Sequence, residues 1–255
     1  MAAARGEFSS RFGFLMAASG SAVGLGNIWG FPTNTASNGG AAFLIAYLVL
    51  TFLLAYPALM AELIIGRHAK SNTLTALKYI SSGKKSRLLA VALGFAGMIT
   101  VSFILSFYAI VSGWFVAYFF AQIARLLGMD GVAQWLTTDT VTRNSIFLIG
   151  FMILTIYIIS AGVKNGIEKW ASRLMPSLII ILLLLIVYVM TLAGAMDGLR
   201  AYLVPDWSRI TEPQLLVDAM GQAFFSLSLG VGTMLVYGSY IRKGENLPLG
   251  GSMVA

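Results

Sequence analysis

Six long apolar segments dominate this sequence. They cover residues 12–31, 41–65, 88–124, 145–162, 175–195 and 215–240. A transmembrane helix needs roughly 20 apolar residues, so these segments are long enough to cross a bilayer. The third is too long for one perpendicular span at about 1.5 Å per residue, so it must tilt or project beyond the membrane. The sequence therefore predicts an all-α polytopic membrane protein with six helices.

Composition supports this assignment and excludes several kinds of active site. Hydrophobic residues make up 58% of the chain and charged residues 11%, whereas a typical soluble domain is about 25% charged. The chain has no cysteine and a single histidine, His68, in a basic loop. A thiolate metal site, a Ser-His-Asp triad and a Cys-His pair are therefore excluded, and we expect no enzymatic activity.

The basic residues indicate an orientation in the membrane. Of the 17 Lys and Arg residues, 13 lie at the two ends of the chain and in the loops after the second and fourth segments. The positive-inside rule then places both termini in the cytoplasm and explains the high pI without a nucleic-acid partner. We expect a cytoplasmic gate segment at 1–11, a transmembrane domain at 12–240 and a cytoplasmic tail at 241–255 that ends before a seventh helix.

The first apolar segment is interrupted at its centre by Gly20-Ser21-Ala22-Val23-Gly24-Leu25-Gly26-Asn27. Glycine costs about 1 kcal/mol relative to alanine inside a helix. One interpretation is close helix packing, because the glycines are spaced as small-residue pairs. The other is a broken helix whose freed backbone groups bind an ion and a ligand, since unwound backbone survives at membrane depth only inside protein or beside a wet cavity. Proline 32 is expected to end this helix at Phe31.

The sixth segment repeats the interruption. Its centre carries Gln, two Ser and three Gly residues, namely Gln222, Ser226, Ser228, Gly221, Gly230 and Gly232. Interruptions in two separate spans favour the broken-helix interpretation over close packing. Paired broken helices are typical of a transporter binding site near the bilayer midplane. Half-helix N-termini attract an anionic group, and neutral oxygens suit a hard cation such as sodium.

Two further polar residues lie inside other spans. Glu62 in the second segment is either a functional intramembrane acid or an interfacial residue near the cytoplasmic end. Tyr108 lies among apolar neighbours in the third segment, where a packed core position is the simpler interpretation.

Motifs along the whole chain carry a resemblance to a known family. They are Arg11-Phe12-Gly13, residues 20–27 with Trp29 and Phe31-Pro32, residues 38–43, Tyr56-Pro57, Glu62, Gly66-Arg67, Tyr108, Trp114, Gly166-Ile167-Glu168-Lys169, residues 221–232 and residues 237–240. With these motifs the chain resembles the neurotransmitter:sodium symporter family, the sodium-coupled amino-acid and amine transporters of the leucine-transporter fold. The resemblance implies the first five-helix inverted repeat plus the sixth helix, with helices one and six discontinuous. The chain covers about half of the family's twelve-helix architecture.

The resemblance also implies roles for individual residues. For the first sodium ion it implies the ligands Ala22, Asn27 and Ser226, and for the second the carbonyls of Gly20 and Val23. The substrate carboxylate would be held by the amides of Leu25 and Gly26 and the hydroxyl of Tyr108. The rest of the substrate pocket would be formed by Ser21, Ala22, Ile104, Phe225, Ser226, Ser228 and Val231. Chloride, a third candidate ion, would be bound by Tyr47, Gln222 and Ser226. Gating or bracing roles are implied for Arg5, Phe8, Glu62 and Tyr240.

Two positions depart from the family pattern. Gly30 replaces a basic residue of the extracellular gate, so a salt-bridged lid is not expected there. Gly24 replaces the aspartate of amine transporters, which favours an amino acid that brings its own carboxylate.

The expected function is sodium-coupled symport of an amino acid across the cell membrane, as part of a full-length transporter. The alternative is a truncated fragment that does not transport, or a half that needs a second chain or self-association. The isolated chain is expected not to transport.

Overall fold

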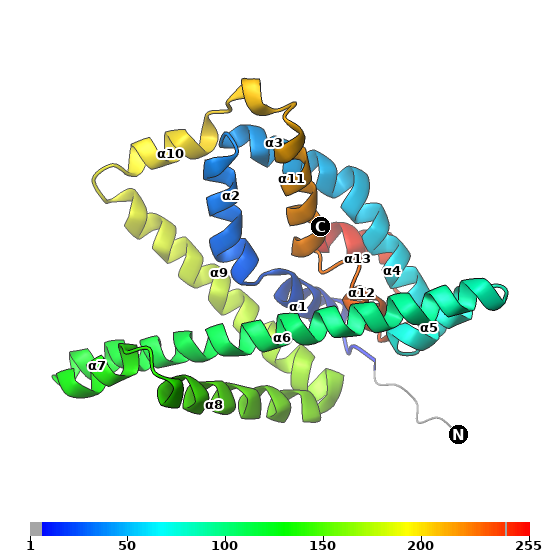
Figure 1. Cartoon of the computed structure of the whole chain (residues 1–255), viewed down its shortest axis with the longest axis horizontal. Helices are drawn as coiled ribbons and strands as arrows, with labels where there is room; N and C mark the ends of the chain where they lie inside the picture. The colour runs from blue at the N-terminus through cyan, green and yellow to red at the C-terminus, as the bar shows by residue number, and fades with distance from the viewer. Residues whose placement is uncertain (1–6, 243) are drawn as a thin grey trace.

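Helices make up most of the described chain. The structure is a computed structural model that describes residues 7–242 and 244–255 (Figure 1). The helices and helical turns are, in order, α1 (Arg11–Ala22), η1 (Gly26–Gly30), α2 (Phe31–Ser37), α3 (Ala41–Leu50), η2 (Thr51–Ala55), α4 (Tyr56–Ala69), α5 (Thr73–Ile80), α6 (Lys84–Leu126), α7 (Asp130–Thr137), α8 (Val141–Ser160), η3 (Val163–Glu168), α9 (Lys169–Met190), α10 (Ala195–Leu203), η4 (Trp207–Arg209), α11 (Pro213–Ser226), α12 (Thr233–Ser239) and α13 (Leu247–Val254). Of these, η1, η2 and η3 are π-helical and η4 is a 3-10 turn.

Several of these helices can cross a membrane. Within the described residues, four continuous spans are long and apolar enough: Ala41–Ala69, Lys84–Leu126, Val141–Ser160 and Val163–Met190. The pair Arg11–Ala22 and Gly26–Ser37, bent by 61°, forms a fifth candidate. The prediction of an all-α, multi-pass membrane protein is therefore confirmed.

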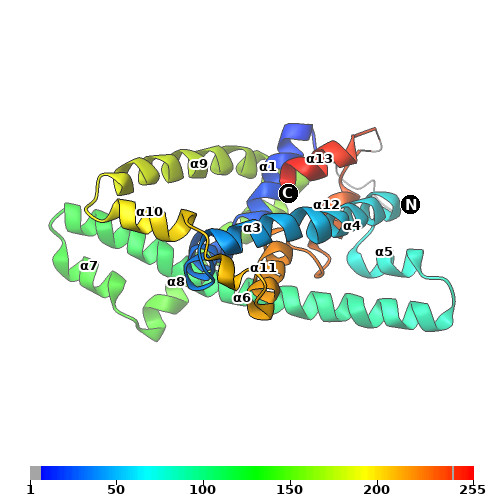
Figure 2. The same cartoon turned by 90° about the horizontal axis from the view of Figure 1, so that it is seen from above.

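The third span is one continuous helix. The 43 residues of α6 correspond to about 65 Å at 1.5 Å per residue, roughly twice the thickness of a hydrocarbon core. It runs across the full width of Figure 1, and Figure 2 shows α6 and α9 along opposite sides of the molecule. A helix of this length has to tilt strongly or project beyond the bilayer, as the sequence indicates.

Helix one is discontinuous, as the resemblance implies. The first part, α1, ends at Ala22, and Val23 has an extended backbone. The chain resumes as η1 and continues into α2, which extends to Ser37. The expectation that Pro32 ends this helix is wrong, because the helical run continues through it from Gly26 to Ser37. Pro32 follows directly on the π-helical turn η1, where the ladder of i→i−4 hydrogen bonds is already interrupted.

Helix six is discontinuous as well. Its first part α11 ends at Ser226 and its second part α12 begins at Thr233. Three residues between or beside these parts have left-handed backbones: Ser228 (φ 53°), Gly230 (φ 82°) and Gly232 (φ 83°). A left-handed backbone is favourable for glycine but unusual for serine. Gly230 and Gly232 are therefore suited to their backbone conformation, whereas Ser228 is not.

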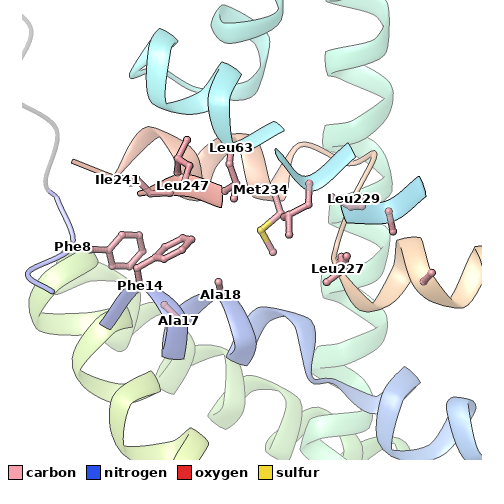
Figure 3. Close-up of a cluster of buried hydrophobic side chains, with 13 residues drawn as sticks. Phe8, Phe14, Ala17, Ala18, Leu63, Leu227, Leu229, Met234, Ile241 and Leu247 are labelled. Carbon is pink, nitrogen blue, oxygen red and sulfur yellow. The ribbon is translucent and has the colours of Figure 1, made fainter. Parts of the chain in front are cut away.

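The main apolar core joins α1, α4 and α12. Phe14 and Ala18 of α1 meet Leu63 of α4 and Met234 of α12, as Figure 3 shows. The helices α4 and α12 cross at backbone distance, because a methyl group added at Gly238 would lie 2.9 Å from Leu63 Cα. This contact fixes the second part of helix six against helix two.

The chain after α12 forms a helix that the sequence analysis did not assign. Leu247–Val254 forms α13, with Leu247, Gly250 and Gly251 buried. A methyl group added at Gly251 would lie 2.6 Å from the Met60 sulfur, so α13 packs closely on α4. Pro248 and the two glycines hide the helical pattern, but Pro248 lies in the first turn and the glycines permit the close packing.

Candidate functional site

The candidate site lies where the two broken helices face each other. Ser228 Oγ, in the break of helix six, donates to the Ser21 carbonyl of helix one at 3.2 Å. The long helix α6 closes one side, because Gly97 lies close to the Val231 carbonyl. Residues from three separate spans therefore surround one region.

Asn27 joins the two breaks through its carboxamide group. Its Nδ2 donates to the Ala22 carbonyl at 2.7 Å, across the break in helix one. Its Oδ1 accepts from Ser226 Oγ at 2.9 Å and from Gln222 Nε2 at 3.0 Å, both on α11. The structure thus brings together Ala22, Asn27 and Ser226, the three residues expected to bind the first sodium ion.

The donor set at Asn27 is chemically uniform. Its oxygens belong to a carbonyl, a carboxamide and a hydroxyl, all neutral and hard. Within the described part of the chain, no group of three His, Cys, Asp or Glu side chains lies close enough to hold a metal ion. Oxygen donors of this kind suit a hard monovalent cation better than a thiophilic metal.

Gly20 and Val23 lie on a different side of helix one. Together with α9 they line a groove of about 630 Å³. A methyl group at Gly20 would lie 3.4 Å from Met175 Cγ on α9, so α9 packs close to α1 here. The two residues expected to contribute to the second sodium site therefore face this groove.

A cavity of about 210 Å³ lies between the breaks and α6. Seven of the residues expected to bind the substrate line it: Ser21, Ala22, Ile104, Tyr108, Phe225, Ser228 and Val231. Leu25 and Gly26 line an adjoining hollow of about 610 Å³, which shares Ile104, Tyr108 and Phe225 with the cavity. Ser226 lines neither space and is directed at Asn27.

Two aromatic side chains cover the glycines of helix one. A methyl group at Gly24 would lie 2.8 Å from the Tyr108 hydroxyl. One at Gly26 would lie 2.7 Å from Cζ of Phe225. Tyr108 belongs to α6 and Phe225 to α11, so both glycines allow side chains of neighbouring helices to approach closely, as the helix-packing interpretation expects.

The break of helix one leaves unpaired amides beside these rings. The Gly24 carbonyl accepts from the amides of Asn27 and Ile28, both at 3.0 Å. Among the described residues, the amides of Leu25 and Gly26 have no acceptor. Two free N–H groups at a helix start form a favourable place for an anionic group.

Glu62 supports the break of helix six. Its Oε1 accepts from the Gly230 amide at 2.7 Å, although the two residues belong to different spans. Its Oε2 is buried and has no hydrogen-bond partner within the described ranges. This contact with the unwound segment fits a bracing role better than an interfacial position.

The residues expected to bind chloride are only partly brought together. Gln222 Nε2 lies 3.3 Å from Ser226 Oγ. The ring of Tyr47 packs edge-on against Phe31, 4.9 Å between centroids, and borders two apolar clusters. Gln222 and Ser226 therefore contact each other, while Tyr47 packs against Phe31.

The end of the molecule near residue 8 is closed by aromatic side chains. Phe8 is buried and stacks on Tyr237, with Tyr240 at an edge-on angle. The Phe8 amide also donates to the Tyr240 carbonyl at 3.2 Å. Arg5, expected to belong to the same gate, lies outside the described residues.

Sequence reasoning missed several residues around these sites. Val101, Leu229 and Thr233 line the 210 Å³ cavity. Glu168 was named only as a motif residue, without a role; it is buried and accepts hydrogen bonds from the amide and hydroxyl of Ser9, and so holds the start of helix one. The spacing of Val101 from Ile104 and Tyr108, three and seven residues, could have identified it as a residue on the same helical face.

Comparisons with known proteins agree with this arrangement. The model of the Sodium:neurotransmitter symporter family matches residues 5–147 and 139–255. The uncharacterized sodium-dependent transporter YhdH of Bacillus subtilis is 36% identical over 95% of this chain and 54% of its own length. The sodium- and chloride-dependent taurine transporter of Bos taurus is 30% identical over 95% of this chain and 45% of its own.

A solved structure shares the fold. The crystal structure of MhsT in complex with L-phenylalanine matches with a TM-score of 0.81 and 38% sequence identity. The match covers 98% of this chain and 57% of MhsT. The chain therefore spans about half the length of the curated relatives it matches.

Proposed function

The chain belongs to the sodium:neurotransmitter symporter family, and we propose that it forms the N-terminal half of a sodium-coupled amino-acid symporter. The observation that carries this proposal is the carboxamide of Asn27. It joins the Ala22 carbonyl in one break to the Ser226 hydroxyl in the other. A cation held by these oxygens would bind both broken helices at once.

Sodium is the cation of the proposal. Ala22 O, Asn27 Oδ1 and Ser226 Oγ would supply part of its first shell, and Gly20 and Val23 carbonyls would supply part of a second site. A hard cation prefers about six oxygen ligands. The ligands still needed would come from the substrate carboxylate and from segments beyond this half.

An amino acid is the substrate of the proposal. The residues that line the 210 Å³ cavity carry no charge; Tyr108 lines it, and Leu25 and Gly26, with their free amides, line the adjoining hollow of about 610 Å³. These donors suit a carboxylate. MhsT was crystallised with L-phenylalanine, which supports a substrate with this group.

Coupling follows from the proximity of the two ligands. Ala22 lines the substrate cavity and its carbonyl is also a sodium ligand of the proposal. A substrate carboxylate placed between the free amides and this carbonyl would contact the cation. Each ligand would then raise the affinity for the other by the same factor.

Chloride is a further ion of the proposal, with Tyr47, Gln222 and Ser226 as its ligands. The contact of Gln222 with Ser226 and the chloride-dependent taurine transporter among the relatives support it. Replacing chloride with gluconate at constant sodium tests it. A lower rate of amino-acid uptake is expected, and an unchanged rate would contradict this part of the proposal.

The proposal is tested by reconstituting the complete transporter that carries this sequence into proteoliposomes. An inward sodium gradient should drive uptake of a labelled amino-acid mixture, whereas an equal choline gradient should not. The isolated 255-residue chain should give no uptake, because it supplies only part of each sodium site. Uptake by the isolated chain would instead favour a complete site formed by self-association, and restoration by a separate second chain would favour a two-chain transporter.

A further inference from the structure

The acid Asp218 is a carboxylate that the proposed mechanism does not use. It lies half-buried on α11, within the sixth apolar segment. Ion pairs within the described residues involve Glu7 and Glu212, but none involves Asp218. An acid inside an apolar helix is costly and is retained mainly where it has a function.

The side chain of Asp218 belongs to a line of polar groups on one face of α11. The line repeats every four residues, which places its members on one side of the helix: Gln214, Asp218, Gln222 and Ser226. We call this line the polar ladder. Exposure falls along it, from the exposed Gln214 through Asp218 to the buried Gln222 and Ser226, which are 7% and 5% exposed.

Helix one supplies amide groups that face the polar ladder. Asn38 Nδ2 lies 3.4 Å from Asp218 Oδ2, and Asn34 Nδ2 lies 3.5 Å from Gln222 Oε1. Gln222 then reaches Asn27, where Nε2 lies 3.0 Å from Oδ1. Polar contacts therefore continue from Asp218 at the exposed end to the oxygens of the Asn27 site.

The remaining contact of Asp218 leaves its charge uncompensated. Gln214 Nε2 donates to Oδ1 at 2.8 Å, and this donor is neutral. Both carboxylate oxygens are thus held by amides, which orient the group without neutralising it. A fixed negative charge on this face of α11 attracts a cation bound further along the same face.

We propose that Asp218 is a positioning residue for sodium, whose charge at the exposed end of the polar ladder stabilises the cation bound at Asn27. This inference rests on the proposed function. Asp218 and Ser226 are eight residues apart, about 12 Å along the helix. Across that distance, at an effective dielectric constant between about 20 and 40, one charge changes sodium affinity by roughly three- to tenfold.

The competing explanation is that Asp218 only fastens α11 to helix one. The substitution Asp218→Asn distinguishes an electrostatic role from a purely structural one. It keeps the size of the side chain and an acceptor oxygen but removes the charge. Asp218→Glu keeps the charge. Asp197→Asn is the matched control, since it removes an exposed carboxylate from the first turn of α10, away from the polar ladder.

The experiment measures the sodium concentration for half-maximal amino-acid uptake by the complete transporter in proteoliposomes at low ionic strength. Asp218→Asn should raise the half-maximal sodium concentration about three- to tenfold, with little change in the maximal uptake rate. Added choline chloride should reduce this difference between the variant and the wild type, because salt screens the charge of Asp218. Asp218→Glu and Asp197→Asn should have a half-maximal sodium concentration close to that of the wild type.

Two results would overturn the inference. An unchanged half-maximal sodium concentration in Asp218→Asn, or a loss confined to the maximal rate, would leave Asp218 a fastening residue while sodium-dependent uptake stands. Uptake by the wild type that does not depend on sodium would overturn the proposed function and this inference together.

Discussion

At the scale of single residues, one carboxamide carries most of the proposed ion chemistry. Asn27 bonds to Ala22 in its own helix and to Ser226 and Gln222 in another. Asparagine serves here because one side chain supplies both a donor that closes the break and an oxygen that faces the second helix. Leucine or alanine could do neither.

Replacing Asn27 with alanine should weaken sodium binding. The substitution removes one proposed ligand and leaves the Ser226 hydroxyl without its acceptor, so a loss of about 1–3 kcal/mol is expected. In the complete transporter, the half-maximal sodium concentration for amino-acid uptake should rise roughly 5- to 150-fold. The control is Asn165→Ala, an exposed asparagine in η3, and equal effects of the two substitutions would contradict the role of Asn27.

The glycine at position 26 should be intolerant of even a methyl group. Gly26→Ala places the new carbon against the Phe225 ring, and overpacking of this kind costs about 1–3 kcal/mol. Amino-acid affinity should fall by about tenfold or more, measured by binding of the labelled substrate. Gly30→Ala is the matched control, because nothing lies within 4 Å of the added methyl group there.

A second substitution makes the Gly26 prediction sharper. If the ring of Phe225 is the obstacle, Phe225→Leu in the Gly26→Ala background should recover part of the lost affinity. A double variant that binds no better than Gly26→Ala would show that the loss has another cause.

At the scale of helices, the crossing of α4 and α12 holds the second part of helix six. Gly66 and Gly238 each lie against the backbone of the opposite helix. Gly238→Ala should therefore lower the melting temperature of the purified protein, with a free-energy loss of about 1–3 kcal/mol. Gly221→Ala on α11 is the control: its added methyl group has nothing within 4 Å, so the melting temperature should stay unchanged or rise. A similar fall of the melting temperature in both variants would contradict this packing argument.

The sequence predicted the type and order of the helices well, because apolar length and interrupted spans are strong signals. It predicted that helices one and six break, since Gly24, Gly26 and the 221–232 run are poor helix formers. It failed at Pro32, which lies inside a helical run just after a π-helical turn, and at α13, where Pro248 fits the helix start and the glycines fit a close contact. Such contacts are made with other helices, so they cannot be predicted from the local helix propensity of the sequence.

The candidate site was predicted in part. Residues within the two interruptions could be identified because the breaks themselves draw attention to them. Val101 could be identified only from its spacing of three and seven residues to Ile104 and Tyr108, and Asp218 could not be identified, since it looks like a surface acid. Their roles depend on which face of α6 or α11 meets the breaks, and that is set by packing between helices.

At the scale of the whole molecule, the orientation in the membrane remains a prediction from the basic residues. These 255 residues contain no cysteine, so a single cysteine introduced among them can report sidedness. In intact cells, a membrane-impermeant maleimide should label a cysteine at Gly131, between the third and fourth spans, but not one at Lys164, after the fourth. Labelling of Lys164→Cys alone would show the opposite orientation.

The central claim is that sodium and an amino acid bind next to each other between the two broken helices. The most direct test is the affinity of the complete transporter for ²²Na⁺, measured with and without a saturating amino-acid substrate. We expect sodium to bind more tightly in the presence of the substrate, and sodium to raise the affinity for the substrate by the same factor. Sodium affinity that does not change with substrate would contradict the shared site.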